Sequence, residues 1–164
     1  NFADDQTSRM PVPGTIKRGE MLPYHIPGND SGYAYSGAIK NPIVVDDSVL
    51  TEGKRLFNIY CGICHGEKLD GNGPLYNGGS GPFPAAPANF IAGPKTTLPE
   101  GTMFWVATYG KNLMGSYASQ VNRYQRWMIV AYIKSVQRKN GVTQAQDDST
   151  QQTLIAAYNQ TRSK

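Results

Sequence analysis

Two cysteines and a histidine lie within five consecutive residues, Cys61-Gly62-Ile63-Cys64-His65. Thiols at this spacing can add to the two vinyl groups of one porphyrin, and the histidine that follows can bind the iron through an imidazole nitrogen. The pattern is the attachment signature of a c-type haem. It predicts one covalently attached haem c, held by Cys61 and Cys64, with His65 as an iron ligand.

Three other chemistries use cysteines at this spacing. A thioredoxin-like redox dithiol requires a preceding strand and a βαβ sheet, and the sequence shows neither pattern. A zinc site requires two more Cys or His ligands, and His25 is the only other candidate in the chain. A disulfide between Cys61 and Cys64 would leave His65 without a role. Haem attachment is therefore favoured over all three.

The second axial ligand decides whether such a haem carries electrons or reacts with small molecules. Of the five methionines, Met114 alone lies in a loop between two expected helices, so we expect its sulfur to bind the iron opposite His65. His25 is the runner-up. An open sixth site is the third alternative, and it would indicate ligand binding or peroxidase-like chemistry.

Further side chains are expected to cover the porphyrin. Residues 66–93 are rich in Gly, Pro and Ala, which suits a loop wrapped around one porphyrin edge. A carbonyl near Pro87 is expected to accept the second ring N–H of His65 and so to fix its tautomer. We expect four side chains to contact the haem: Pro87, Phe90, Trp105 and Tyr117.

A first helix should deliver the haem motif. Asp47 or Ser48 is suited to cap its start, and Cys61 follows its end. Gly53 and Phe57 lie four residues apart and share one face, so the glycine would let another helix approach closely while the phenylalanine fills the contact.

Two later helices complete the cage. One is expected over residues 99–109, starting at Pro99 or Glu100 and ended by Gly110, with Phe104, Trp105 and Ala107 toward the haem. The other is expected over residues 123–138, where a broad apolar surface that includes Tyr132 should pack against the first helix.

Composition divides the chain into three regions. Residues 1–46 are dense in Pro and Gly and predict an extended arm, whose apolar and aromatic residues suit packing along its own domain or a partner. Residues 47–140 form the mono-haem domain. Residues 141–164 are polar and predict a frayed or short helical tail. The predicted fold class is all-α, with three main helices around one haem.

The formal net charge is +4, and several basic residues gather near one helix: Arg123, Arg126, Lys134, Arg138 and Lys139. We interpret them as a solvated helix face rather than a docking patch for an acidic partner. Nucleic-acid binding is excluded because no aromatic and basic module is present.

Residues 127–133 form the longest apolar run, too short to cross a bilayer. Because haem c is attached outside the cytoplasm, we expect an exported chain, soluble or anchored by other means.

Over residues 47–140 the sequence resembles the class I cytochromes c, through the Gly53/Phe57 helix, the haem motif, the loop methionine and the helix around residues 126–133. Within them it is most similar to the mono-haem cytochrome subunit of bacterial alternative complex III, a membrane quinol-oxidising assembly. Three segments carry this similarity: RMPVPGTIKRG at 9–19, GNGP at 71–74 and MGSYASQ at 114–120. Relatives often have Pro after the axial Met, where this chain has Gly115.

The resemblance implies an electron carrier rather than an enzyme, which relays electrons drawn from quinol toward a terminal oxidase. The implied partners are a multi-haem cytochrome, an iron–sulfur subunit, integral membrane subunits and the oxidase. The implied location is the periplasmic side of a bacterial inner membrane, reached through partners or a lipid anchor upstream of Asn1. Two alternatives stay open: a freely diffusing periplasmic cytochrome c shuttle, and a haem enzyme or gas sensor with an open sixth site.

Overall fold

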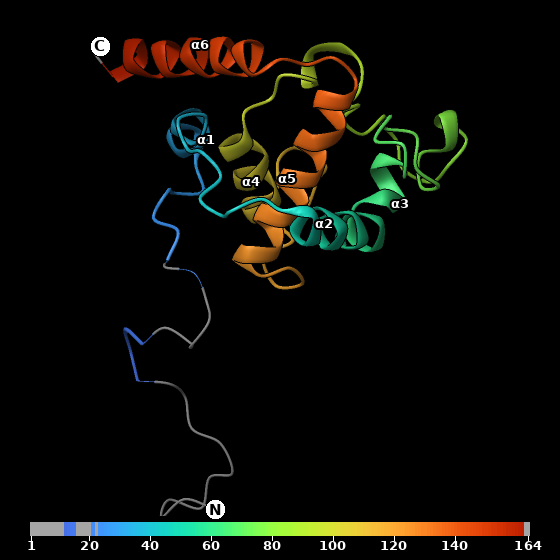
Figure 1. Ribbon diagram of the computed structural model, residues 1–164, viewed down its shortest axis with the longest axis horizontal. Coiled ribbons are helices and arrows are strands. Elements are labelled where there is room, and N and C mark those ends of the chain that lie inside the picture. Colours follow the sequence, from blue (N-terminus) through green and yellow to red (C-terminus); the bar gives the residue numbers. More distant parts are fainter. Residues whose placement is uncertain (1–11, 16–20, 22, 163–164) are drawn as a thin grey trace, which may run out of the picture.

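A computed structural model describes residues 12–15, 21 and 23–162 (Figure 1). Segment 9–19, on which part of the resemblance rests, lies mostly outside them. Over the described ranges the chain forms no strand, and the all-α fold class is confirmed. The α-helices are α1 (Asp30–Ser36), α2 (Asp47–Tyr60), α3 (Gly62–His65), α4 (Glu100–Tyr109), α5 (Arg123–Lys139) and α6 (Gln144–Arg162), and the short 3₁₀ helices are η1 (Asn77–Gly79) and η2 (Gly93–Lys95).

Helix α2 is capped one residue earlier than expected. The Asp46 carboxylate accepts the backbone N–H of Val49 at 2.9 Å, and Asp47 is the first helical residue. Ser48 supports this cap, since its hydroxyl donates to the same carboxylate oxygen at 2.7 Å. Because α2 ends at Tyr60, the haem motif forms a separate short helix, α3.

Helix α5 crosses α2 at very close range (Figure 1). A Cβ atom on Gly53 would clash with the carbonyl oxygen of Met128, so only glycine fits at this crossing. Beside it, the fully buried ring of Phe57 lies 5.6 Å from that of Tyr132. Both contacts match the expectation from the sequence, and they fix where α2 releases the haem motif.

Helix α4 packs between α5 and the N-terminal segment. On one side the Phe104 ring stacks on Trp127 with centroids 4.1 Å apart. On the other side the indole N–H of Trp105 donates to the carbonyl of Pro27 at 2.9 Å, and the backbone N–H of Gly101 donates to Ile39 at 3.1 Å. The predicted range of α4 and its termination at Gly110 are confirmed.

The segment before residue 46 contains α1, a helix that the breaker-rich sequence did not predict. Asn29 caps it by accepting the backbone N–H of Gly32 at 2.9 Å. The serine at its end, Ser36, is fully buried against α4. For residues 23–45 the surface that the arm follows is therefore the chain's own domain.

Residues 144–162 form one long helix, α6, which lies beside α1 (Figure 1). Asp147 anchors it, accepting from Lys134 at 2.8 Å and from Arg138 at 3.2 Å. Lys134 and Arg126 are only 3% and 4% exposed, so the interpretation of the basic cluster as a solvated face is wrong for these two. Their charge did not reveal that α6 covers Lys134. It also did not reveal that the guanidinium group of Arg126 packs on the Phe104 ring.

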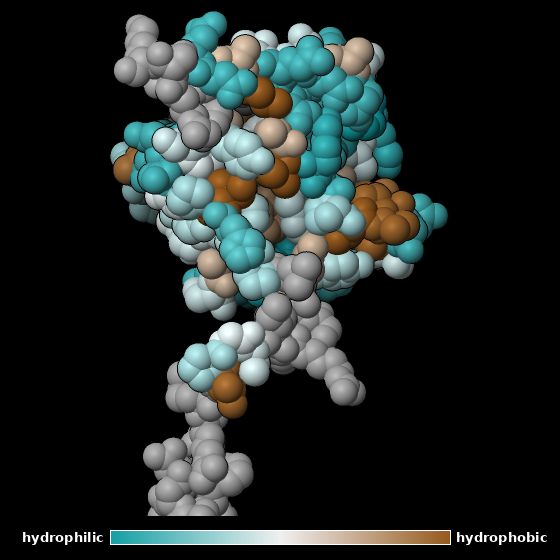
Figure 2. All heavy atoms as spheres, turned by 90° about the vertical axis from the view of Figure 1, so that its left-hand side faces the viewer, coloured by the Kyte–Doolittle hydropathy of each residue, from teal (hydrophilic) through white to brown (hydrophobic). Residues whose placement is uncertain are grey.

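On the face shown in Figure 2, hydrophobic residues form separate patches between hydrophilic ones. In the described ranges, no helix is long and apolar enough to cross a membrane.

Candidate functional site

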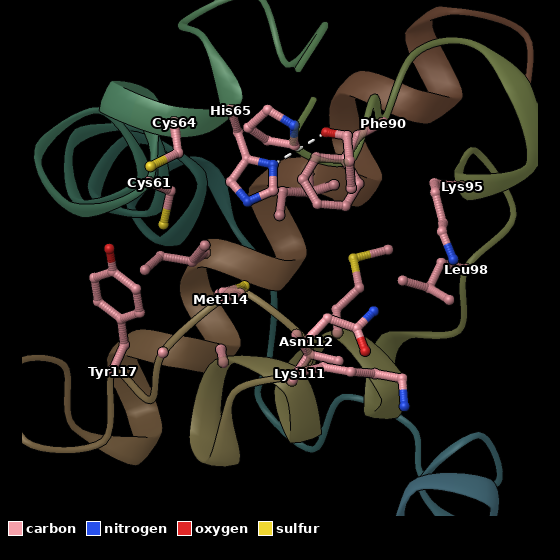
Figure 3. Close-up of a pocket in the computed structure, with 18 of the residues that line it drawn as sticks. Cys61, Cys64, His65, Phe90, Lys95, Leu98, Lys111, Asn112, Met114 and Tyr117 are labelled. Atoms are coloured by element: carbon pink, nitrogen blue, oxygen red, sulfur yellow. Dashed lines mark hydrogen bonds between the residues drawn. The ribbon is translucent and has the colours of Figure 1, made fainter. Parts of the chain in front are cut away.

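A cavity of about 540 Å³ opens between the haem motif and helices α4 and α5 (Figure 3). The walls come from six parts of the chain: α1, α2 with α3, the loop between α3 and α4, α4 itself, the loop of residues 111–121, and α5. Most of the lining side chains are apolar. Only a few of the lining side chains are polar or charged.

His65 projects into this cavity from the end of α3. Its Nδ1 atom lies 3.0 Å from the carbonyl oxygen of Ala88, the contact drawn in Figure 3. Since a carbonyl only accepts hydrogen bonds, Nδ1 carries the proton and the Nε2 lone pair is left for another partner. The ring of Phe90 stacks on the imidazole at 5.0 Å. The expected carbonyl beside Pro87 is thereby confirmed.

Burial lowers the pKa of His65 below its usual value, although the bond to Ala88 acts in the opposite direction. The imidazole is therefore neutral at physiological pH, the form that binds metal ions.

Met114 lies across the cavity from His65 (Figure 3). It closes a tight turn with Lys111, in which the backbone N–H of Lys111 donates to Met114 at 2.9 Å and the N–H of Met114 donates back at 3.0 Å. Two further bonds tie this loop to α4: Tyr117 N–H to Ala107 at 3.0 Å, and the Ser116 hydroxyl to Thr108 at 2.6 Å. The backbone of Met114 is thus fixed by hydrogen bonds before and after it in the loop.

His25, the runner-up ligand, is exposed and does not line the cavity. Of the two candidates, Met114 is the residue that the structure brings opposite His65.

The two thiols lie together at one end of the cavity (Figure 3). Burial raises the pKa of Cys61 to about 12, with a smaller contribution from neighbouring Cys64. Burial also raises the pKa of Cys64. Redox-active dithiols have lowered pKa values, so the thioredoxin-like alternative does not fit. Among the described residues no group of His, Cys, Asp or Glu could hold a zinc ion, which removes the second alternative.

Residues 48–133 match the family model described as cytochrome c oxidase, cbb3-type, subunit III. The chain belongs to this family of class I cytochromes c. The match spans α2, the haem motif, α4 and most of α5, the parts that form the cavity. No curated protein matches the chain. This cytochrome is an electron carrier that works through haem.

The cavity of the cytochrome fits the haem c that the family implies. Two adjacent thiols can take the vinyl groups, a neutral imidazole presents its free nitrogen, and a soft thioether faces it. The surrounding wall is apolar and can cover a flat porphyrin.

Three of the four side chains expected to cover the haem line the cavity: Pro87, Phe90 and Tyr117. The fourth, Trp105, does not, and that expectation is corrected. Trp105 is on the side of α4 that packs against the N-terminal segment, where its indole bonds to Pro27. Phe104 is likewise directed into the core, against Trp127.

The face that α4 turns to the cavity carries Met103, Val106 and Ala107. Of the three positions expected toward the haem, only Ala107 is on this face. The spacing of 103, 106 and 107 follows the helical repeat, which separates them from Trp105.

Several lining residues of the cytochrome were missed by the sequence interpretation, among them Tyr33, Lys95 and Lys111. Tyr33 belongs to α1, far from the motif in the chain, and no local signal pointed to it. Lys111 was detectable, because it lies three residues before the expected ligand. The fully buried Gln137 was missed as well, although its amide holds the loop by donating to Phe90 at 3.0 Å.

Proposed function

We propose that this cytochrome carries single electrons through one covalently bound haem c with His65 and Met114 as axial ligands, and that it relays electrons from a quinol-oxidising membrane complex toward a terminal oxidase. One observation carries the ligand assignment. His65 and Met114 face each other across an apolar cavity that has the two thiols at one end.

Bound haem iron accepts and releases one electron at a time. The protein side chains set how it does so. Cys61 and Cys64 keep the porphyrin in place in both oxidation states, and the Ala88 carbonyl orients His65 and makes its free nitrogen more basic. The neutral thioether of Met114 favours ferrous iron, and the apolar wall disfavours the extra charge of the ferric state. The thioether and the apolar wall favour a high reduction potential, whereas the more basic imidazole favours the ferric state and acts in the opposite direction.

Replacement of the proposed thioether ligand tests this assignment. The oxidised parent protein should show the weak near-infrared band that arises from sulfur-to-iron charge transfer. Met114→Ala should abolish this band, lower the reduction potential and open the iron to cyanide or carbon monoxide.

Met103→Leu is the matched control, because Met103 also lines the cavity and this change should leave the band in place. Persistence of the band in Met114→Ala would contradict the assignment. A parent protein without the band, together with site opening in His25→Ala, would instead identify His25 as the ligand.

The relay role is supported by the matched family, whose description names an oxidase subunit, and by the segments that resemble alternative complex III. Affinity purification of the tagged protein from its native membranes tests this role. Co-purification with a multi-haem cytochrome, an iron–sulfur subunit and integral membrane subunits is the expected result. Recovery with oxidase subunits alone would make the chain an oxidase subunit, and recovery as a monomer in the soluble fraction would favour the periplasmic shuttle.

We also propose that the cytochrome resides on the periplasmic side of a bacterial inner membrane, through its partners or a lipid anchor upstream of Asn1. Mass spectrometry of the natural mature protein tests the anchor, because a mature terminus at Asn1 without lipid would rule it out.

A further inference from the structure

The charges around the cavity are unevenly distributed. The two thiols are at one end, and the ammonium groups of Lys95 and Lys111 are at the opposite end (Figure 3). No Asp or Glu is among the described residues that line the cavity. A third cation, Arg126, donates through one terminal nitrogen to the Val121 carbonyl and lies over a phenylalanine ring, while its buried Nε has no partner among the described residues. The end opposite the thiols is therefore suited to an anionic group.

Lys111 is held at this end from two directions. Its backbone is fixed in the turn that also presents Met114. Its ammonium lies 3.9 Å from the centre of the Tyr33 ring, which itself packs edge-on against Trp105 at 5.3 Å. Helix α1 thus positions a cation beside the turn that carries the proposed iron ligand.

Lys95 is held independently at the end of η2. Its carbonyl accepts from the Gln137 amide at 3.2 Å, and this amide is buried in α5. The backbone bond therefore fixes where the Lys95 side chain starts. Among the described residues, neither Lys95 nor Lys111 forms an ion pair, in contrast to Lys40 and Lys134.

We propose that Lys95 and Lys111 bind the two propionate carboxylates of the haem, and that Tyr33 positions Lys111 for this contact. This inference rests on the proposed function. The vinyl and propionate groups of haem are on opposite edges of the porphyrin, so thioether bonds at Cys61 and Cys64 direct the carboxylates toward the lysines. Pairing with ammonium groups offsets the cost of placing two carboxylates beside an apolar wall.

The carboxylate carbons of the haem give a direct test. Holoprotein produced with aminolevulinate labelled with ¹³C at its carboxyl carbon carries the label in both propionate carboxylates, and the reduced, diamagnetic protein yields one NMR signal from each. Lys111→Gln should shift one signal, Lys95→Gln should shift the other, and the double variant should shift both. Tyr33→Leu should shift the same signal as Lys111→Gln.

The reduction potential at neutral pH gives a second readout. Loss of a nearby positive charge disfavours the ferrous state, so each Lys→Gln variant should have a lower potential, while Lys111→Arg should retain the parent value. Lys68→Gln is the matched control, because Lys68 is exposed, lies near the haem motif and does not line the cavity. It should leave both carboxylate signals in place.

Unchanged carboxylate signals in the double variant would overturn this proposal. If the near-infrared band persists in that sample, His65/Met114 ligation stands and only the propionate contacts are wrong. A parent protein without the band would instead refute the ligand assignment. Should the double variant fail to incorporate haem, the two single variants decide by the same signals.

Discussion

Single side chains in this cytochrome hold loops that have little secondary structure of their own. Gln137 is the clearest case. It is fully buried in α5, and its amide nitrogen donates to the carbonyls of Phe90 and Lys95 at 3.0 and 3.2 Å. One residue therefore places both the ring that stacks on His65 and the lysine at the far end of the cavity.

Gln137→Leu should destabilise the holoprotein by about 1–3 kcal/mol, because the buried carbonyl of Phe90 and the partly buried carbonyl of Lys95 would lose their donor. Guanidinium unfolding of the haem-bound protein, followed by circular dichroism, measures the free energy of unfolding. Gln152→Leu is a suitable control, since Gln152 is exposed on α6. Equal stability of the two variants would show that Gln137 does not hold the loop.

At the scale of helices, the start of α2 depends on a charged cap. The bonds from Val49 and Ser48 lower the pKa of the Asp46 carboxyl. A carboxyl whose pKa is lower in the folded state stabilises the protein above its ordinary pKa, and this contribution is lost as the pH falls through the folded value.

Asp46→Asn keeps a cap acceptor but removes this titration. The parent should therefore be more stable than the variant at about pH 6, and the difference should shrink toward about pH 3. Asp46→Ala, which lacks an acceptor at every pH, controls for loss of the cap itself. Guanidinium midpoints at the two pH values measure the effect, and a difference independent of pH would contradict it.

The crossing of α2 and α5 depends on one glycine. Gly53→Ala would place a methyl group against the Met128 carbonyl and force the helices apart, at a cost of about 1–3 kcal/mol. Lys54→Ala is the control, because Lys54 is exposed on the same helix and does not line the cavity. Thermal unfolding of the two holoproteins compares them. A melting temperature in Gly53→Ala as high as in Lys54→Ala would mean that the crossing tolerates a side chain.

At the scale of the whole molecule, the cavity lies where a small protein would have the centre of its core. Its volume is about 540 Å³, and its walls come from helices and loops that are far apart in the sequence. Without the haem, the apolar walls of this cavity would be exposed to water, and a small domain would lose much of the burial on which its stability depends.

The haem-free protein should therefore lack a cooperative thermal transition. Cys61→Ala with Cys64→Ala removes covalent attachment, and after haem extraction this variant should show no heat-absorption peak in calorimetry. The parent holoprotein, treated in the same way, should retain both haem and peak. A sharp transition in the extracted variant would show that the protein core is sufficient by itself.

The sequence determined the local chemistry. The haem motif is contiguous, so its thiols and imidazole needed no fold to be recognised. The periodic apolar pattern and the terminating Gly110 were enough for α4 and α5, whose observed ranges differ little from the expected ones. Met114 stood out because it alone lies in a loop between helices.

Only the tertiary structure decided which faces meet. Helix α4 is apolar on nearly every side, so its sequence could not tell that Trp105 faces the N-terminal segment while Met103 faces the cavity. The burial of Lys134 depends on Asp147 of α6, and the place of Tyr33 at the cavity depends on α1 packing against α4. These contacts join residues far apart in the chain, and helical periodicity carries no information about such partners.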